Sequence, residues 1–208
     1  MFKNRKDAGI KLAEALHEHK DTGVLVLAIP RGGVELGYEV AKALDAGFSL
    51  LVCRKLPYPF NPESGFGAIA EDGSLYINRA ATASVSDDMM EEIILRQREE
   101  IKRRIDTLRD GQPLPEIKGH TVILIDDGIA MGSTMHAAVE LCRKQDAAKI
   151  IVAVPVAGHH AIQEFGRIAD EIVVLESPVN FYAVAQVYEN WYDVSDEEAL
   201  EIYHRPRQ

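Results

Sequence analysis

The sequence lacks most of the features that mark secreted or membrane-spanning proteins. Only two cysteines, Cys53 and Cys142, occur in 208 residues, and their spacing suits neither a disulfide framework nor a metal site. We therefore expect buried thiols in a reducing cytoplasm. No apolar run approaches the roughly 20 residues of a membrane span, and the start, MFKNRKDAG, lacks the apolar segment of a signal peptide. These absences predict a cytoplasmic protein that does not bind membranes.

Positive charge is also scarce. The chain carries 23 Lys and Arg against 33 Asp and Glu, a formal net charge of -10. Because generic binding to nucleic acid needs a basic surface, we expect no nucleic-acid partner, and a phosphorylated ligand would have to be held by local groups. Hydrophobic residues make up 47% and charged residues 27% of the chain, as in ordinary globular proteins. We therefore expect residues 1–208 to form one domain.

Apolar runs alternate with segments whose apolar residues recur at helical spacing. Such alternation is typical of β-α-β units, which place parallel strands side by side and cover them with helices. We therefore expect an α/β fold with a largely parallel sheet flanked by helices. The expected strands are residues 24–29, 48–55, 75–77, 121–125, 149–154 and 171–175, and the expected helices are 7–19, 34–44, 86–110, 132–145 and 158–168.

Two segments do not fit this alternation. Residues 56–73 contain three prolines and three glycines but neither Lys nor Arg. Because long connections in compact domains are usually functional or mobile, we expect this segment to be a flexible loop without regular structure. The C-terminal stretch, about residues 177–208, concentrates the aromatic residues, and we expect it to form a small hood.

The most informative segment reads VILIDDGIAMGSTM at residues 122–135. A buried strand has no use for Asp126 and Asp127 at its end unless they meet a ligand, a metal or a helix terminus. In open α/β sheets, ligands collect beyond the carboxyl ends of the strands, where a helix start points unpaired N–H groups outward. Gly128 and Gly132 let the backbone come close to a ligand. The turn is therefore an anion cradle of the phosphate-binding type.

The two acids restrict what that cradle can bind. Carboxylates repel phosphate oxygens, but they accept hydrogen bonds from hydroxyls or help to hold hydrated Mg²⁺. A ligand with a phosphate at one end and a vicinal diol at the other, such as a ribose 5-phosphate, satisfies both halves. A Walker loop is excluded because no Gly-Lys-Ser/Thr follows. A plain turn, with Asp127 as turn former, stays open.

Several motifs of the chain resemble those of type I phosphoribosyltransferases. VILIDDGIAMGST is similar to their motif for binding phosphoribosyl diphosphate (PRPP), and IPRGG at residues 29–33 resembles their diphosphate loop. Residues 56–73 stand where the flexible catalytic loop of the family belongs. The ending FYAVAQVYENWYDVSDEEA is similar to that of a poorly characterised bacterial and archaeal branch. The resemblance thus extends across most of the chain.

The resemblance implies a reaction and a site. The 5-phosphoribosyl group would pass from PRPP to a small nitrogenous acceptor, with release of diphosphate. Mg²⁺ would be held mainly by diphosphate, ribose hydroxyls and water, so we expect no direct protein ligand, and we expect a homodimer. Asp126 and Asp127 would hold the ribose hydroxyls, and the backbone after them the 5-phosphate. The expected PRPP-binding residues are Asp126, Asp127, Gly128, Ile129, Ala130, Met131, Gly132, Ser133, Thr134, Arg31, Gly32 and Gly33.

Two cations are candidates for catalytic roles. Arg31, followed by two glycines and a helix start, is placed to meet a diphosphate with its charge and nearby backbone donors. By resemblance, Lys55 would also reach the diphosphate. Both would act by neutralising the leaving group. A solvated loop arginine and an ordinary strand-end lysine would give the same pattern.

The acceptor is less defined. Ala130 stands where hypoxanthine-guanine phosphoribosyltransferases carry an Asp, the base that takes the purine proton. Tyr182 is the nearest counterpart of the aromatic residue that stacks the base in those enzymes, although a packing role stays open. Met131 replaces a usual Thr, and Ala185 a commoner Gly. We expect a planar acceptor other than hypoxanthine or guanine. Two other functions stay open: a PRPP-sensing regulator without catalysis, and a hydrolase of a nucleotide or sugar phosphate.

Overall fold

The computed structural model describes residues 1–207 and is built around one parallel sheet. Its strands follow the order β2-β1-β6-β7-β8, and every neighbouring pair is parallel. This arrangement confirms the α/β fold that the alternating pattern predicts. The strands are β1 (Leu25–Ala28), β2 (Gly47–Leu50), β6 (Thr121–Ile125), β7 (Lys149–Val156) and β8 (Glu171–Glu176).

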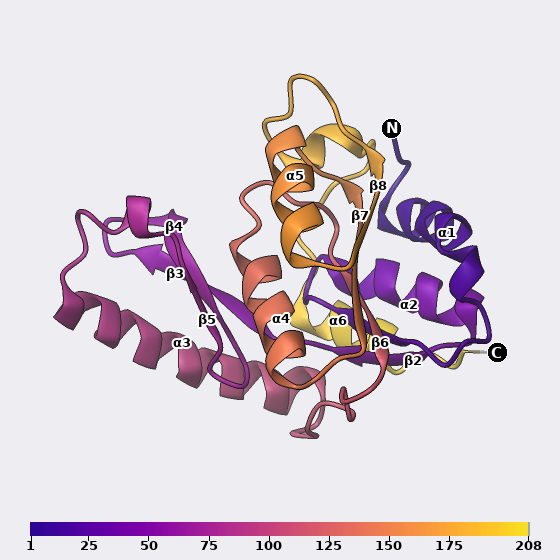
Figure 1. Ribbon diagram of the computed structural model, residues 1–208, viewed down its shortest axis with the longest axis horizontal. Helices are drawn as coiled ribbons and strands as arrows, with labels where there is room; N and C mark the ends of the chain where they lie inside the picture. The colour runs from indigo at the N-terminus through magenta and orange to yellow at the C-terminus, as the bar shows by residue number, and fades with distance from the viewer. Residues whose placement is uncertain (208) are drawn as a thin grey trace.

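Helices cover both faces of this sheet, as Figure 1 shows. Successive side chains of a strand point to opposite faces, so a strand buried on both sides is apolar throughout. In β6, Ile123 shares a core cluster with residues of α1 and α2, whereas Leu124 shares one with residues of α4 and α5. The helices are α1 (Arg5–Ala15), α2 (Gly33–Leu44), α4 (Ser133–Lys144) and α5 (His159–Ile168), and the 3-10 turn η1 (His17–His19) follows α1.

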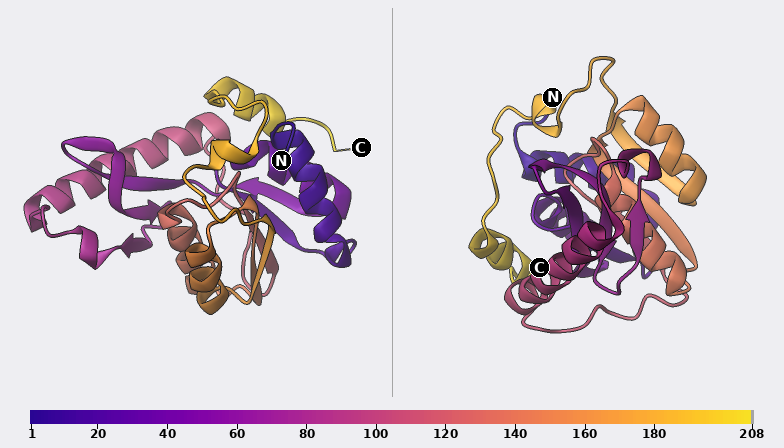
Figure 2. Two further views of the ribbon diagram at one scale, coloured as in Figure 1. Left: turned by 90° about the horizontal axis from the view of Figure 1, so that it is seen from above. Right: turned by 90° about the vertical axis from the view of Figure 1, so that its left-hand side faces the viewer.

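A second, antiparallel sheet lies beside the parallel one. Its strand order is β3-β4-β5, and the long helix α3 packs along it, so that residues 53–108 form an antiparallel lobe (Figures 1 and 2). Leu56 and Phe66 from the sheet share a buried cluster with Ile93 and Ile101 of α3. The elements are β3 (Cys53–Tyr58), β4 (Asn61–Ala70), β5 (Leu75–Ile77), η2 (Arg79–Ala81) and α3 (Asp87–Leu108).

Two of the sequence-based expectations, for residues 48–55 and 56–73, are wrong in and next to the antiparallel lobe. The single strand predicted over residues 48–55 is wrong, because this run divides between β2 and β3, which belong to different sheets. The absence of regular structure predicted for residues 56–73 is wrong too, because β3 and β4 occupy most of the segment. Pro57 lies where the pairing shifts register, which is where a strand tolerates a residue without an N–H. β4 also passes so close to β5 at Gly67 that a Cβ there would lie 2.1 Å from the Tyr76 carbonyl oxygen, which is why this strand position is a glycine. The mobility of residues 56–73 stays a prediction.

The C-terminal segment returns over the parallel sheet and its helices. It contains η3 (Val184–Val187) and α6 (Asp196–Tyr203), and α6 packs against α2 and α3. The start of the chain pairs with this segment. The N–H of Phe2 donates to the Val187 carbonyl at 2.7 Å, and the N–H of Glu189 donates to the Phe2 carbonyl at 2.8 Å. Whether the segment covers a bound ligand as a hood stays a prediction. Within residues 1–207, no helix is both long and apolar enough to cross a membrane.

Candidate functional site

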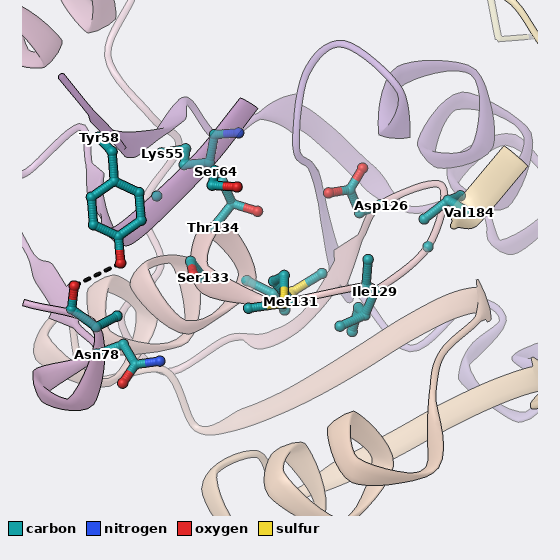
Figure 3. Close-up of a pocket in the computed structure, with 16 residues that line it drawn as sticks. Lys55, Tyr58, Ser64, Asn78, Asp126, Ile129, Met131, Ser133, Thr134 and Val184 are labelled. Carbon is teal, nitrogen blue, oxygen red and sulfur yellow. Dashed lines mark hydrogen bonds between the residues drawn. The ribbon is translucent and has the colours of Figure 1, made fainter. Parts of the chain in front are cut away.

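A cavity of about 560 Å³ lies between the turn after β6 and the antiparallel lobe (Figure 3). It opens at the carboxyl end of the parallel sheet, where ligands of α/β folds collect. The cavity brings together Asp126, Lys55 and every residue of the predicted phosphate loop from Gly128 to Thr134. Its lining is Lys55, Tyr58, Ser64, Gly65, Asn78, Ala81, Asp126, Gly128, Ile129, Ala130, Met131, Gly132, Ser133, Thr134, Met135 and Val184.

The phosphate loop is anchored by its backbone. The N–H of Ile129 donates to the Val156 carbonyl at 2.9 Å, which ties the loop to the end of β7. Gly132 has a φ of +72°, and a Cβ there would lie 2.7 Å from the Phe165 ring, so glycine suits this position. Among the described residues, no side chain caps the start of α4. The N–H groups of its first turn are therefore available to an anion.

The two acids of the motif lie in different surroundings. Asp126 lines the cavity, and its Oδ1 accepts the N–H of Asp127 at 2.8 Å. Burial, and then the charge of Asp127, raise the pKa of Asp126 well above that of an ordinary aspartate. Asp127 instead meets Arg5, whose Nε and Nη2 lie 3.0 and 2.9 Å from its Oδ2. Burial raises the pKa of Asp127, and Arg5 opposes that rise.

The predicted diphosphate loop lies against these acids. A Cβ at Gly32 would lie 2.0 Å from Oδ2 of Asp127, and one at Gly33 would lie 2.6 Å from the Ile125 carbonyl oxygen. Larger residues would push this loop away from the end of β6, so the two glycines bring it beside the motif. The peptide bond between Pro30 and Arg31 is cis.

The Arg31 side chain reaches the tail of the chain. Its Nη1 donates to Oδ1 of Asp196, the first residue of α6, at 3.2 Å. Arg103 of α3 approaches the other oxygen of the same carboxylate, with its Nη2 at 3.3 Å. Arg54, the neighbour of Lys55, donates from Nε to Gln97 of α3 at 3.1 Å. Several arginines thus gather behind the diphosphate loop, although the chain as a whole is acidic.

Tyr182, the predicted acceptor-binding residue, lines neither the cavity beside the phosphate loop nor its neighbour, and its role stays a prediction. Tyr182 is 83% exposed, whereas its neighbour Phe181 lines a second cavity of about 530 Å³. This cavity shares Asn78, Ala130 and Met131 with the first and also contains Glu164. Of these two adjacent aromatic residues, only Phe181 lines a cavity described here.

Sequence reasoning also missed Arg5, Tyr58 and Asn78. Arg5 lies in a segment that is an ordinary helix start in the sequence, and its partner Asp127 is 122 positions away, so no local signal marks the contact. Tyr58 and Asn78 lie in the antiparallel lobe, and Tyr58 donates its hydroxyl to the Ala81 carbonyl at 2.6 Å. Their place beside the phosphate loop depends on how the two sheets pack, which periodicity does not encode.

The chain belongs to the phosphoribosyl transferase family. The model of the phosphoribosyl transferase domain matches residues 2–189, which is nearly the whole chain. Two relatives from strains of Mycobacterium tuberculosis, whose names class them with the phosphoribosyl transferases, are each 39% identical over 207 residues. The match covers 99% of this chain and 47% of each relative, so the chain spans about half the length of the curated relatives it matches.

Solved structures of similar fold are also known. TT1426 from Thermus thermophilus is 35% identical, with a TM-score of 0.82, and the match covers 98% of this chain and 97% of that chain. The AQ2163 protein from Aquifex aeolicus is 16% identical, with a TM-score of 0.51, and the match covers 82% of this chain and 73% of that chain. The second similarity concerns the fold alone.

Proposed function

We propose that this chain transfers the 5-phosphoribosyl group from PRPP to a planar nitrogenous acceptor, with release of diphosphate. One observation carries the proposal: a single cavity joins the buried carboxyl of Asp126 to the uncapped start of α4. A carboxylate accepts hydrogen bonds from a ribose diol, and a helix start binds a phosphate. Family membership over residues 2–189 supports the same reaction class.

The ribose 5-phosphate half of the substrate would lie on the turn after β6. Asp126 and Asp127 would accept hydrogen bonds from the ribose 2- and 3-hydroxyls, and the backbone from Gly128 to Thr134 would bind the 5-phosphate. Ser133 and Thr134 add hydroxyl donors at the helix start. The side chain of Met131 has no hydrogen-bond donor, so at this position only the backbone N–H can serve the phosphate.

The diphosphate half would lie towards Arg31, Gly32, Gly33 and Lys55. As the bond to the anomeric carbon breaks, positive charge develops on the sugar and negative charge on the departing diphosphate. Arg31 and Lys55 would stabilise that negative charge, and the fixed cavity would position the reacting atoms. No covalent nucleophile is needed.

Mg²⁺ is the metal that the family implies. Asp126 lines the cavity, and its carboxylate oxygens belong to the donor type that hydrated Mg²⁺ accepts. Bound together with PRPP, Mg²⁺ supplies positive charge to the leaving diphosphate. Exclusion of water during transfer would fall to the hairpin of β3 and β4, which contributes Tyr58 and Ser64 to the cavity wall.

The acceptor would approach from the second cavity. Its wall offers the ring of Phe181, which suits a planar compound, and it adjoins the first cavity at Ala130 and Met131. Tyr182, the residue expected from the sequence, would enter only if the tail rearranged, because its side chain is 83% exposed.

A screen of acceptors tests this function. Nucleobases and small planar amines are each incubated with PRPP and Mg²⁺, and diphosphate release is followed. We expect release that depends on one acceptor class and that falls to background in Asp126→Asn. Saturable PRPP binding without release for any acceptor would favour a PRPP-sensing regulator. Release without any acceptor would favour the hydrolase.

A further inference from the structure

The most completely paired charge near the site is that of Arg5, outside every motif of the sequence. Its side chain is only 4% exposed and contacts three groups. Nε and Nη2 contact Oδ2 of Asp127, Nη1 donates to the Tyr192 carbonyl at 2.8 Å, and the guanidinium lies 4.0 Å from the centroid of the Trp191 ring. A buried guanidinium with these partners is fixed in one orientation.

Asp127 is held from the other sides as well. The Tyr188 hydroxyl donates to its backbone carbonyl at 2.8 Å, and its carboxylate leaves no room for a side chain at Gly32. The charged and titratable groups that face Asp127 are therefore Arg5 from α1, Asp126 beside it and Tyr188 from the tail. Arg5 is the one cation among them.

The chain ends hold Arg5 in place. Besides the two bonds of Phe2 described above, the N–H of Asn190 donates to the Lys3 carbonyl at 3.0 Å, so residues 2–3 pair with residues 187–190. Trp191 and Tyr192, which contact Arg5, follow directly. The two ends of the chain thus form one support behind the PRPP motif.

We infer that Arg5 is a positioning residue for the PRPP site, which acts by fixing the carboxylate of Asp127 between the ribose diol and the diphosphate loop. This inference rests on the proposed function. Arg5 itself is not among the residues that line the cavity. Without it, Asp127 would be a buried carboxylate beside Asp126 with no counter-ion, and such a group takes up a proton or moves. Loop 31–33, which packs on Asp127 at Gly32, would lose its support.

The test compares Arg5→Gln, Asp127→Asn, the double variant and Arg5→Lys, with Lys11→Gln as the matched control. Lys11 forms an ion pair with Asp7 on the same helix, at 2.8 Å, and its Nζ lies 5.2 Å from the centroid of the Phe2 ring, but it lines neither cavity. We expect Arg5→Gln to lower kcat/KM by about 100-fold, as misplacement of a reacting group does. Arg5→Lys should recover part of the loss, and Lys11→Gln should match the wild type.

Two further readouts separate positioning from general destabilisation. Because Arg5 opposes the rise in the pKa of Asp127, its loss should move the acidic limb of the kcat/KM profile to higher pH. In the Asp127→Asn background, Arg5→Gln should cause no further loss of rate, since both changes remove the same element. If the rate losses of Arg5→Gln and Asp127→Asn multiplied in the double variant, and the acidic limb of the kcat/KM profile did not move, the inference would be overturned.

Hydrogen exchange tests the inference without catalysis. In ligand-free Arg5→Gln, or in Arg5→Lys if the first variant does not fold, the amides of residues 29–34 and 126–129 should exchange faster than in Lys11→Gln. Equal exchange in those segments would overturn the inference whatever the acceptor screen gives. If exchange rises but PRPP does not bind the wild type, the proposed function fails and the role of Arg5 in fixing these loops stands.

Discussion

The proposed 5-phosphate end and the proposed diphosphate end of the candidate site differ in how they are prepared for an anion. At the first, the donors are backbone N–H groups of a loop that β7 and Phe165 hold in place. At the second, one of the two expected cations is the side chain of Arg31, which already pairs with Asp196 at 3.2 Å. Fixed backbone donors need no rearrangement when a ligand arrives, whereas a paired side chain must exchange partners.

This difference suggests a division of labour between the two ends. In the proposed reaction, the end that binds the 5-phosphate would be preorganised, and the end that releases diphosphate would carry an internal anion, Asp196, that can replace the product. The two acids of the motif also differ in their surroundings, because Asp126 faces the cavity and Asp127 faces Arg5.

The largest effect is expected at the ribose between the two ends. Replacing both acids, Asp126→Asn with Asp127→Asn, removes charge-assisted hydrogen bonds worth roughly 1.5–3 kcal/mol each. PRPP affinity measured by calorimetry with Mg²⁺ should therefore fall by about 10²–10⁴-fold. An unchanged affinity would remove these acids from the ribose site.

The acceptor should show a loss of similar size. General-base help is typically worth about 10²–10⁴-fold in rate, and Ala130 cannot provide it. We expect hypoxanthine and guanine to be poor substrates in steady-state assays. If either turned over with kcat/KM above roughly 10⁴ M⁻¹s⁻¹, our interpretation of position 130 would be wrong.

A smaller effect, of opposite sign, concerns stability. Because burial raises the pKa of Asp126, the folded protein keeps this proton to higher pH than the unfolded chain does, and stability is lost as pH rises through that window. Asp126→Asn should therefore stabilise the ligand-free protein by about 0.5–2 kcal/mol at neutral pH, and by much less in acid. Thermal unfolding across pH measures this, and a destabilised variant at neutral pH would contradict it.

A severalfold effect is expected at the diphosphate end. Asp196→Asn removes the anion that competes for Arg31, so diphosphate should bind more tightly and leave more slowly, by about 3- to 10-fold if the pair is worth close to 1 kcal/mol. Glu197→Gln, the next acid of α6, is the control. Weaker diphosphate binding in Asp196→Asn would show instead that Asp196 holds Arg31 in its working position.

For the mobility of residues 56–73, we predict the direction of a change on ligand binding but no magnitude. If the hairpin of β3 and β4 closes over the reaction, its amides should exchange more slowly with PRPP and acceptor bound than in the free protein. Equal exchange in both states would make the hairpin a fixed wall.

The sequence predicts the parallel sheet well and the antiparallel lobe poorly. Strand 121–125 is found at the predicted residues, because a buried parallel strand needs an unbroken apolar run that periodicity reveals. In contrast, Pro57 and Gly67 indicate a loop in the sequence, although a register shift and a close backbone approach accommodate them in strands.

The site was predictable where one short segment supplies it. Residues 126–134 carry both the acids and the anion cradle, so the motif alone places them together. Arg5 and Phe181 come from distant parts of the chain. Their proposed roles depend on the pairing of the two chain ends and on which of two adjacent aromatic residues lines the second cavity, and neither leaves a local pattern in the sequence.

The most direct test of the central claim is a calorimetric titration of the wild-type protein with PRPP in the presence of Mg²⁺. We expect saturable binding of one PRPP per chain, with ribose 5-phosphate competing for the same site because the preorganised end recognises it. A flat titration, or binding that ribose 5-phosphate leaves untouched, would contradict the assignment of residues 126–134 to the phosphoribosyl group.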